Sequence, residues 1–385
     1  MTIHRLAPVA DFPSAAEYTY LDAASISLTP KPVVETVLDF QQNVASGGTV
    51  SFDEEAETKA LEGARNASAK LVNANRDEIS ILTSATEAIG ALAWSVELKR
   101  GGNVVTTDVE FPSVTYPWMR VAKERGIEVR FAHNVDGIID DHEFNRLVDD
   151  RTQVVCISHV EYGTGQRFDL PGLSELAHKH GARLLVDATQ SAGVLPIDVK
   201  RDDIDFLVSA SYKWLLGPFG IALFYLKREH YEKLEPPLVG WRSTEDPFDF
   251  QATKLTYATA ARKFEYSTMN YAAAMGLARA IEYLLNIGIE RVLEHSLGLN
   301  ELLLVGAREL GANALTPLDK DRRAGIIALR FPSLPSRDVG RGLEQGKVII
   351  SHRFNAVRFS PHVYNDEQDI HRAIEVLRTI VRRGQ

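Results

Sequence analysis

The chain has 385 residues, of which 45% are hydrophobic and 25% are charged, and its formal net charge is −9. This length predicts roughly two or three domains, and the negative balance excludes a dedicated nucleic-acid binder, which carries a basic face. The single cysteine, Cys156, excludes an internal disulfide framework and a cysteine-rich zinc site. Because the start of the chain, MTIHRLAPVADFPSAAEY, lacks the apolar core of a signal peptide, we expect a cytoplasmic protein.

Short apolar runs alternate with amphipathic helical stretches through the first two thirds of the chain. Runs such as VVCIS and RLLVD do not alternate between polar and apolar residues, which indicates strands covered on both faces. The pattern predicts an α/β fold with a mostly parallel, seven-stranded sheet and helices on both faces. We expect strands at Ile79–Thr83, Asn103–Thr107, Glu128–Ala132, Gln153–Ser158, Arg183–Asp187, Asp205–Ser209 and Ile221–Leu226. We expect helices at Ala85–Lys99, Val114–Arg125 and Leu170–His180.

After Pro236 the pattern changes, and a long irregular loop covers residues 239–260, where such loops are often functional. The segments that follow predict helices at Tyr271–Asn286 and Glu290–Leu310, strands at Gly325–Phe331 and Ala356–Ser360, and a final helix from Asp366. We therefore expect an N-terminal arm over residues 1–20, a large domain over 21–269 and a small α+β domain over 270–385.

The apolar run Phe206–Leu226 contains one charge, Lys213. Its length matches the roughly 20 residues of a membrane span. However, Gly217, Pro218 and Gly220 interrupt it, and a central lysine is costly in lipid. We therefore expect two buried strands joined by a loop, and no association with a membrane.

An acid and a lysine each follow a predicted strand. Asp187 ends the run RLLVD, and Lys213 lies just past DFLVSASY, at the carboxyl edge where ligands of open α/β sheets bind. A buried lysine loses its charge readily and can form a Schiff base with an aldehyde. An acid can keep a pyridinium nitrogen protonated, so the pair suits pyridoxal phosphate. Two alternatives stay open: Asp187 caps a turn, or Lys213 lays its stem on apolar neighbours.

Motifs for other ligands are missing from the sequence. It contains no GxGxxG after a strand, no GxxxxGK[ST] and no HExxH. His178 and His180 end a predicted helix, where positive charge interacts favourably with the helix dipole. This role at the helix end is favoured over metal binding. We expect no bound metal.

Three segments carry a family resemblance: DATQSAGVLPIDV, SASYKWLLGPFG and VRFSPHVYNDEQDI. In this order and spacing they resemble the class V aminotransferases, a group that includes cysteine desulfurases, kynureninases and isopenicillin N epimerase-like enzymes. The resemblance extends from Tyr20 to the last helix. It implies the fold of type I pyridoxal-phosphate-dependent transferases, the cofactor pyridoxal 5'-phosphate, an amino-acid substrate and a homodimer with shared active sites.

The resemblance assigns roles around the cofactor ring. Lys213 matches the lysine that forms the Schiff base, Asp187 the partner of the ring nitrogen, and Gln190 the residue that contacts the phenolic oxygen. Tyr212 matches a phosphate-contacting tyrosine. Many relatives carry a serine where this chain has Ala210, so the serine contact is not carried over.

The phosphate is expected where TSATEAIGALAW begins a helix, at the backbone N–H groups of Ala85 and Thr86. A capping box of Ser84 and Glu87 is a compatible alternative. Phe111 matches the residue that covers the pyridine ring, with a core phenylalanine as its alternative.

Two further roles lie outside this group. Thr268 matches a threonine that reaches the phosphate of the neighbouring subunit, although Ser267 stands where relatives have glycine. Arg358 matches the arginine that clamps the substrate α-carboxylate, with a surface arginine on an edge strand as its alternative.

The reaction type is left with several candidates. Desulfurases of this family need a mobile cysteine near the carboxylate arginine, and the segment VIISHRFNAVRFS has none; Cys156 lies in a predicted buried strand, where a thiol is inert. We expect an aminotransferase that forms a Schiff base with its substrate and removes the Cα proton. A C–S or other β-lyase is the alternative, followed by an epimerase, and a non-catalytic protein is disfavoured. Tyr162, Arg353, Trp241 and Arg242 are candidates for shaping the substrate pocket.

Overall fold

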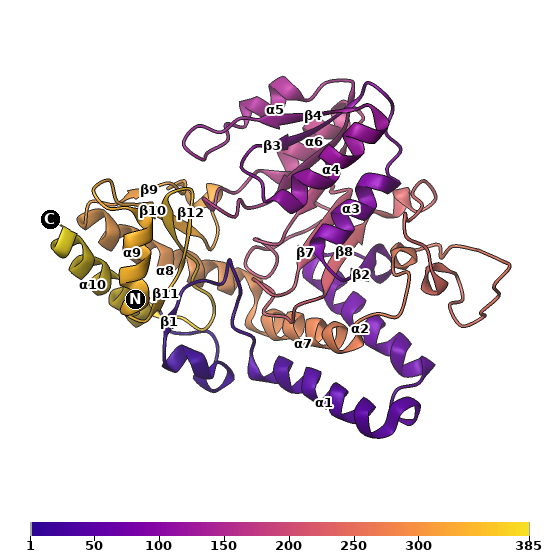
Figure 1. Ribbon diagram of the computed structural model, residues 1–385, viewed down its shortest axis with the longest axis horizontal. Helices are drawn as coiled ribbons and strands as arrows, with labels where there is room; N and C mark the ends of the chain where they lie inside the picture. The colour runs from indigo at the N-terminus through magenta and orange to yellow at the C-terminus, as the bar shows by residue number, and fades with distance from the viewer. Residues whose placement is uncertain (1, 385) are drawn as a thin grey trace.

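The alternating strands and helices form one seven-stranded sheet in the computed structural model, which describes residues 2–384 (Figure 1). Its strands are β2 (Ile79–Leu82), β3 (Asn103–Thr107), β4 (Glu128–Ala132), β5 (Thr152–Ser158), β6 (Arg183–Asp187), β7 (Phe206–Ala210) and β8 (Ala222–Leu226). They lie in the order β2-β8-β7-β6-β5-β3-β4. The strands from β7 to β4 run parallel, and β8 runs antiparallel to both of its neighbours. The predicted sheet is confirmed.

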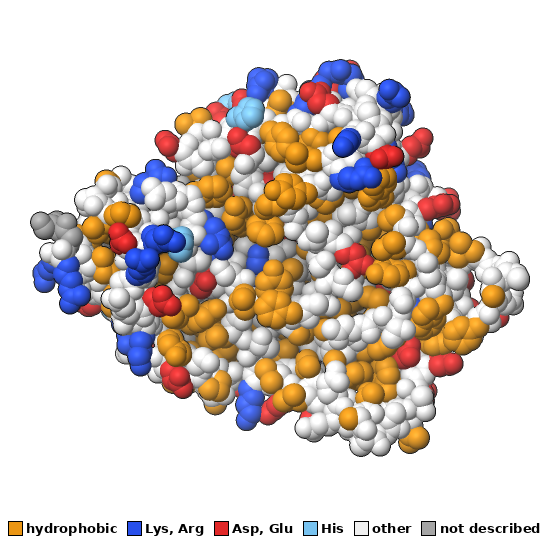
Figure 2. All heavy atoms as spheres, viewed as in Figure 1, with side chains coloured by type: hydrophobic (Ala, Val, Ile, Leu, Met, Phe, Trp, Pro, Cys, Tyr) orange, Lys and Arg blue, Asp and Glu red, His pale blue; other side chains and the backbone are white. Residues whose placement is uncertain are grey.

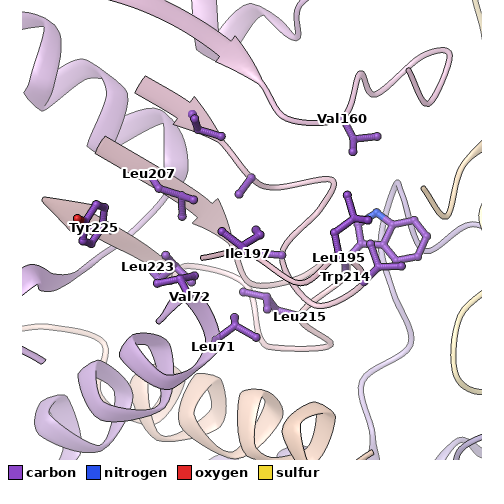
Figure 3. Packing of buried hydrophobic residues seen from close by; sticks show 14 of the residues in the cluster. Leu71, Val72, Val160, Leu195, Ile197, Leu207, Trp214, Leu215, Leu223 and Tyr225 are labelled. Carbon is purple, nitrogen blue, oxygen red and sulfur yellow. The ribbon is translucent and has the colours of Figure 1, made fainter. Parts of the chain in front are cut away.

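Two helical layers cover the sheet, because successive side chains of a strand point to opposite faces. In β5, Cys156 packs into the layer with α3 and α4, whereas Ile157 packs toward α2, α6 and α7. Figure 3 shows the second layer, where Leu207 and Leu223 of the strands lie beside Val72 of α2. The helices around the sheet are α2 (Glu54–Val72), α3 (Ala85–Ser95), α4 (Pro112–Arg125), α5 (His142–Leu147), α6 (Leu170–Lys179) and α7 (Tyr271–Ile287).

Two of these helices differ from the predicted limits by more than one residue. Helix α3 stops before Lys99, because Val96 takes an extended conformation and is buried. Helix α4 begins at Pro112, before the expected Val114, since proline is favoured in the first turn of a helix. Its end at Gly126 is left-handed (φ 68°), a conformation that glycine adopts without strain.

The C-terminal part, residues 289–384, forms a second, four-stranded sheet in the order β12-β13-β10-β9. Its strands are β9 (Asn313–Ala314), β10 (Ile327–Arg330), β12 (Ser351–Arg353) and β13 (Ala356–Phe359). Its helices are α8 (Ile289–Glu309), α9 (Ser336–Gln345) and α10 (Glu367–Gly384), and α8 packs on α10. The predicted α+β character is therefore present, and Figure 1 shows this part beside the large sheet.

The N-terminal segment packs against the C-terminal part. Strand β1 (Thr19–Tyr20) pairs in parallel with β11 (Val348–Ile349), and the Leu6 N–H donates to the Val363 carbonyl at 2.9 Å. Helix α1 (Lys31–Gly47) then packs against α7, which also packs on α2. Helix α7 thus lies with the large sheet, and the predicted domain boundary near residue 270 stays a prediction.

The apolar run Phe206–Leu226 folds as expected into two strands, β7 and β8, with Lys213 in the loop between them. Over residues 2–384, no single helix is long and apolar enough to cross a membrane. Helices α7 and α8 satisfy that criterion only as a pair, and they are bent by 75°.

Candidate active site

A pocket opens at the carboxyl ends of β5, β6 and β7, the edge where ligands of open α/β sheets bind. It encloses about 80 Å³. Its lining consists of Ser84, Ala85, Thr86, Phe111, Ser113, Ser158, Tyr162, Asp187, Thr189, Gln190, Ala210, Tyr212 and Lys213. A larger hollow of about 690 Å³ is lined by residues of the loop 239–256. We place the chemistry in the smaller pocket because it joins a lysine shielded by protein to a buried acid.

Lys213 is held at this pocket by the residue that follows it. The indole of Trp214 is fully buried, donates to Gln190 Oε1 at 2.8 Å, and packs tilted on His362 with ring centroids 5.1 Å apart. A Cβ on Gly325 would lie 2.1 Å from the indole, so a larger residue there would displace it. The loop with Lys213 is therefore anchored to the C-terminal part.

The environment of Lys213 shifts its amine toward the neutral form. Its side chain is partly accessible through the pocket mouth, but protein surrounds the ammonium group. This burial lowers the pKa of Lys213 to about 8; Arg358 and Arg353 act in the same direction, and Asp187 opposes them. The Nζ atom lies 5.5 Å from the centroid of the Phe111 ring. A neutral amine at the mouth of a pocket is a nucleophile.

Asp187 is buried at the end of β6 and faces the same pocket. Burial raises its pKa, whereas hydrogen bonds from Thr189 and the charge of Lys213 lower it. The Thr189 N–H donates to Asp187 Oδ1 at 2.8 Å, so Asp187 also caps the turn, as the alternative proposed. Its second oxygen can accept from a ligand cation.

A second buried acid, Glu110, lies behind this one. It accepts hydrogen bonds from the Ser158 N–H at 2.7 Å and the Ser158 hydroxyl at 2.5 Å. Burial raises the pKa of Glu110, and the charge of Asp187 adds to the rise. Two neighbouring buried carboxylates cannot both ionise easily. Glu110 therefore keeps its proton, and Asp187 is the acid left to carry charge.

The start of α3 offers a site for an anion. Ser84 caps the helix by accepting from the Glu87 N–H at 3.1 Å. Within the described chain, no partner is recorded for the N–H groups of Ala85 and Thr86, and the helix dipole favours negative charge there. The Thr86 hydroxyl donates to Ser113 Oγ at 2.7 Å. The Ser84 cap is compatible with an anion site at these amides, but the capping box is not formed, because the Glu87 carboxylate accepts from the Thr83 N–H at 2.8 Å.

Of the residues just before Lys213, Tyr212 is the polar one that faces the pocket. Its ring stacks on Phe219 with centroids 4.5 Å apart. Ser209 and Ser211 are fully buried, and Ser211 donates to the Pro218 carbonyl.

An aromatic wall borders the pocket. Phe111 is 46% exposed, so the core alternative for this residue is wrong. Its ring meets Tyr162 edge to face, with centroids 5.4 Å apart at 83°, and Tyr162 in turn packs on Phe354 at 5.7 Å. The open face of Phe111 can stack on a flat ligand ring and exclude water.

Arg358 lies next to this wall but does not line the pocket. Strand β13 is flanked by β12 and β10, and Arg358 is 1% exposed, so the alternative of a surface arginine on an edge strand is wrong. Burial lowers its pKa to about 10. Nε donates to Ser351 Oγ at 2.9 Å, and Nη2 donates to Ser25 Oγ at 2.6 Å and to Asp22 at 3.4 Å.

Thr268 is exposed and lies outside the pocket lining of its own chain. Ser113, Ser158, Thr189, Glu110 and Asp22 belong to the site but were not singled out from the sequence. The only sequence signal of Ser113, Ser158 and Thr189 is their position next to an expected strand or helix end, which many polar residues share. Asp22 and Glu110 have no such signal.

The single cysteine does not line the pocket. Cys156 is fully buried, its Sγ lies 3.9 Å from the Val114 carbonyl oxygen, and burial raises the pKa of its thiol. At the hairpin between β12 and β13, Phe354 and Asn355 form a tight two-residue turn, each with positive φ. Neither element presents a reactive thiol to the pocket.

These features fit pyridoxal phosphate. The free amides of Ala85 and Thr86 suit its phosphate, the Phe111 face suits its ring, Asp187 suits its ring nitrogen and Lys213 suits its aldehyde. Gln190 Nε2 donates to the Ala24 carbonyl at 3.1 Å, which leaves one amide N–H for the phenolic oxygen.

The model of the family "Aminotransferase class-V" matches residues 19–372, so the chain belongs to this family. The chain is 31% identical to a "Probable cysteine desulfurase" of Pyrococcus abyssi, over 97% of this chain and 96% of the relative. It is also 31% identical to the "Uncharacterized aminotransferase YcbU" of Bacillus subtilis, over 94% and 95% of the two chains. An apo structure of a cysteine desulfurase from Thermococcus onnurineus NA1 superposes with a TM-score of 0.89 at 28% identity, covering 97% of each chain. The predicted family and fold type are confirmed.

Proposed function

We propose that this enzyme breaks the C–S bond of a cysteine-derived amino acid and that no thiol of its own takes up the sulfur. Enzyme class and cofactor follow from the family: it is a class V enzyme that uses pyridoxal phosphate. Relatives named cysteine desulfurases favour C–S cleavage over the transamination expected from the sequence. The observation that carries the proposal is the burial of Cys156, which leaves the pocket without an accessible thiol.

Each residue of the pocket has its own role in the proposed reaction. Pyridoxal phosphate supplies an aldehyde for amines and a ring that withdraws electrons from the substrate Cα. Lys213 holds the cofactor and, once released, accepts the Cα proton on Nζ, since its lowered pKa leaves the amine partly neutral. Asp187 keeps a proton on the ring nitrogen, and Phe111 shields the ring from water. The Cβ–S electron pair leaves with sulfur, which takes up a proton to give a thiol from a thioether or a persulfide from L-cystine, and hydrolysis of the remaining three-carbon unit gives pyruvate and ammonia.

Arg358 is proposed to bind the substrate α-carboxylate. Its Nη1 donates to the Tyr162 carbonyl at 2.6 Å and keeps one N–H free. A substrate carboxylate that replaces the Ser25 hydroxyl at Nη2 would pair with both terminal nitrogens. The other contacts hold the guanidinium in place, so little reorganisation is needed.

The enzyme is also proposed to work as a homodimer. Large apolar side chains lie exposed next to the pocket loop and along the loop 239–256, among them Phe219, Leu238, Phe250 and Leu255. Figure 2 shows apolar side chains across the middle of one face, with charged ones toward its periphery. A second copy would cover such surface and bring its exposed Thr268 to this pocket.

The test is a product balance on the purified holoenzyme. S-Methyl-L-cysteine, L-cystine and L-cysteine are supplied with and without a keto-acid acceptor, and the sulfur product (thiol, persulfide or sulfide), pyruvate, alanine and ammonia are measured. We expect one pyruvate and one ammonia for each molecule of sulfur product, independent of the acceptor, and none from the Lys213→Ala control. Alanine equal to sulfur would instead indicate a desulfurase, and acceptor-dependent amino-acid formation would indicate an aminotransferase.

A further inference from the structure

Arg353 is a cation without an acidic partner at the edge of the active site. It lies on β12, directly before the tight turn Phe354–Asn355. Among residues 2–384, no carboxylate lies within 4.0 Å of it in the recorded ion pairs, and its recorded hydrogen bond runs from Nη1 to the His352 carbonyl at 2.7 Å. The residue is exposed to solvent.

The strand register places Arg353 on the same face as Arg358. Ser351 pairs with Arg358 and Arg353 pairs with Ala356, and cross-strand partners project to the same side of a sheet. That face meets the large domain, since Arg358 donates to the Tyr162 carbonyl at 2.6 Å. In Figure 1, β12 lies on the side of the C-terminal part that is nearest the large sheet.

The charge of Arg353 reaches the pocket. It counters the burial that raises the pKa of Tyr162, and it contributes to the lowered pKa of Lys213. Phe354 anchors the hairpin tip on Tyr162, and a Cβ on Gly163 would lie 1.9 Å from the Phe354 ring. The absence of a side chain at residue 163 thus lets the tip, and Arg353 with it, approach the pocket mouth.

The neighbouring arginine differs in this respect. Arg358 pairs with Asp22 at 3.4 Å, whereas no acidic partner is recorded for Arg353 among residues 2–384. The hydroxyl of Tyr162 also has no recorded partner in the described chain. A cation and a hydroxyl at a pocket mouth form a binding site for a carboxylate.

We propose that Arg353 and the Tyr162 hydroxyl bind a second carboxylate, carried at the far end of the substrate side chain. The substrate class is then an amino acid with an acidic side-chain terminus, such as S-carboxymethyl-L-cysteine or L-cystine. This inference rests on the proposed function in one respect: Arg358, not Arg353, takes the α-carboxylate.

Matched pairs of ligands test the subsite, because each pair differs only by carboxylate against amide. They are L-aspartate and L-asparagine, L-glutamate and L-glutamine, and S-carboxymethyl- and S-carbamoylmethyl-L-cysteine. Dissociation constants are measured on the holoenzyme by rapid mixing, from the absorbance of the bound cofactor. We expect the acid of at least one pair to bind about 10–100-fold more tightly, since hydrogen bonds to charged groups contribute about 1.5–3 kcal/mol.

The variants assign this preference to residues. Arg353→Gln should remove it and leave the binding of the amides within about threefold, Arg353→Lys should keep part of it, and Tyr162→Phe should reduce it. Arg341→Gln is the control, because Arg341 is exposed on α9 and pairs only weakly with Asp338, at 3.8 Å. It should keep the full preference.

Two results would overturn the inference. One is that no acid binds more tightly than its amide. The other is that Arg353→Gln weakens the binding of acids and amides equally, which would mean that Arg353 binds the α-carboxylate. Turnover of S-methyl-L-cysteine by the same preparation separates the two proposals. Turnover without a preference for acids removes only this subsite, whereas a preference without C–S cleavage removes the proposed function and leaves the subsite in place.

Discussion

The guanidinium of Arg358 donates from Nη1 to the carbonyl of Tyr162 at 2.6 Å, and this bond joins the C-terminal sheet to the loop that follows β5. Residues 196 positions apart in the sequence thus meet at the edge of the pocket. The same guanidinium pairs with the buried Asp22. Arg358 therefore has a structural contribution as well as its proposed role in substrate binding, and substitutions can separate the two.

Arg358→Gln should raise KM for amino-acid substrates about 10–100-fold, the loss of a charge-assisted pair. It should also destabilise the fold by about 3–5 kcal/mol, because Asp22 is left buried without its partner. The double variant Arg358→Gln/Asp22→Asn should recover much of the stability and none of the affinity. Denaturant unfolding and steady-state kinetics measure the two effects, and recovery of both would show that Arg358 serves only packing.

The pKa of Lys213, lowered to about 8 by burial, predicts how the apoenzyme takes up its cofactor. The rate should rise about tenfold per pH unit below pH 8 and level off above it, because only the neutral amine attacks an aldehyde. Lys213→Ala should retain no cofactor after borohydride reduction and dialysis.

Lys263 provides the matched control for this lysine. It is also buried and its pKa is also lowered by burial, but it donates to the Tyr231 carbonyl and does not line the pocket. Lys263→Ala should keep the covalent cofactor. Peptide mapping that located the reduced cofactor on any lysine other than Lys213 would contradict the assignment.

Glu110 should make stability fall as pH rises. Burial raises its folded pKa, so above the ordinary value of about 4.3 the unfolded chain releases a proton that the folded chain keeps. Its contribution is therefore complete below that value and is lost as pH rises through the folded pKa. Glu110→Gln mimics the protonated acid, and its melting temperature relative to wild type should increase from pH 5 to pH 9. The exposed Glu232→Gln should show no such trend.

Much of the fold was predictable because the central strands are buried on both faces. Such strands read as unbroken apolar runs, and the buried strands Asn103–Thr107 and Arg183–Asp187 have the expected limits. The edge strand Glu128–Ala132 also has the expected limits, although it is only partly buried. The ends of β7 differ by one residue, since Ser209 and Ala210 are both buried and give no local signal.

The site was predictable where residues follow a strand end, as Asp187 and Lys213 do, because topology alone brings those ends together. Contacts between distant segments were not. The pairing of Arg358 with Asp22 and the packing of Phe354 on Tyr162 depend on how the two sheets dock. Burial of Glu110 gave no signal either, since its neighbours in VEFPS resemble those of many exposed glutamates.

Cys156 should be dispensable for sulfur release. Its thiol packs between β5 and α4 with a raised pKa, so Cys156→Ala should keep turnover within a few-fold. The cavity left behind should cost about 1 kcal/mol of unfolding free energy. Release of cysteine persulfide from L-cystine, measured as sulfide after reduction with a thiol, is the measurement, with circular dichroism as the folding control. Complete loss of sulfur release in a folded variant would favour a desulfurase in which this thiol becomes accessible.

The last prediction concerns the proposed dimer, in which Thr268 completes the pocket of the partner. Thr268 is exposed and lies outside the pocket of its own chain. A hydroxyl bonded to a phosphate contributes about 1.5–3 kcal/mol, so Thr268→Ala should weaken cofactor retention about 10–100-fold without changing the oligomeric state. Equilibrium dialysis and sedimentation measure the two quantities, with the neighbouring Ser267→Ala as the control.

Mixing two inactive variants decides whether the sites are shared. If Thr268 serves the partner's pocket, a heterodimer of Lys213→Ala and Thr268→Arg chains carries both lesions in one site and leaves the other intact. Activity should then return to about one quarter of the wild-type value at equal mixing, because half of the dimers are mixed and each has one working site of two. No recovery despite proven subunit exchange would mean that Thr268 acts within its own chain, since every site of the mixture would then carry one lesion.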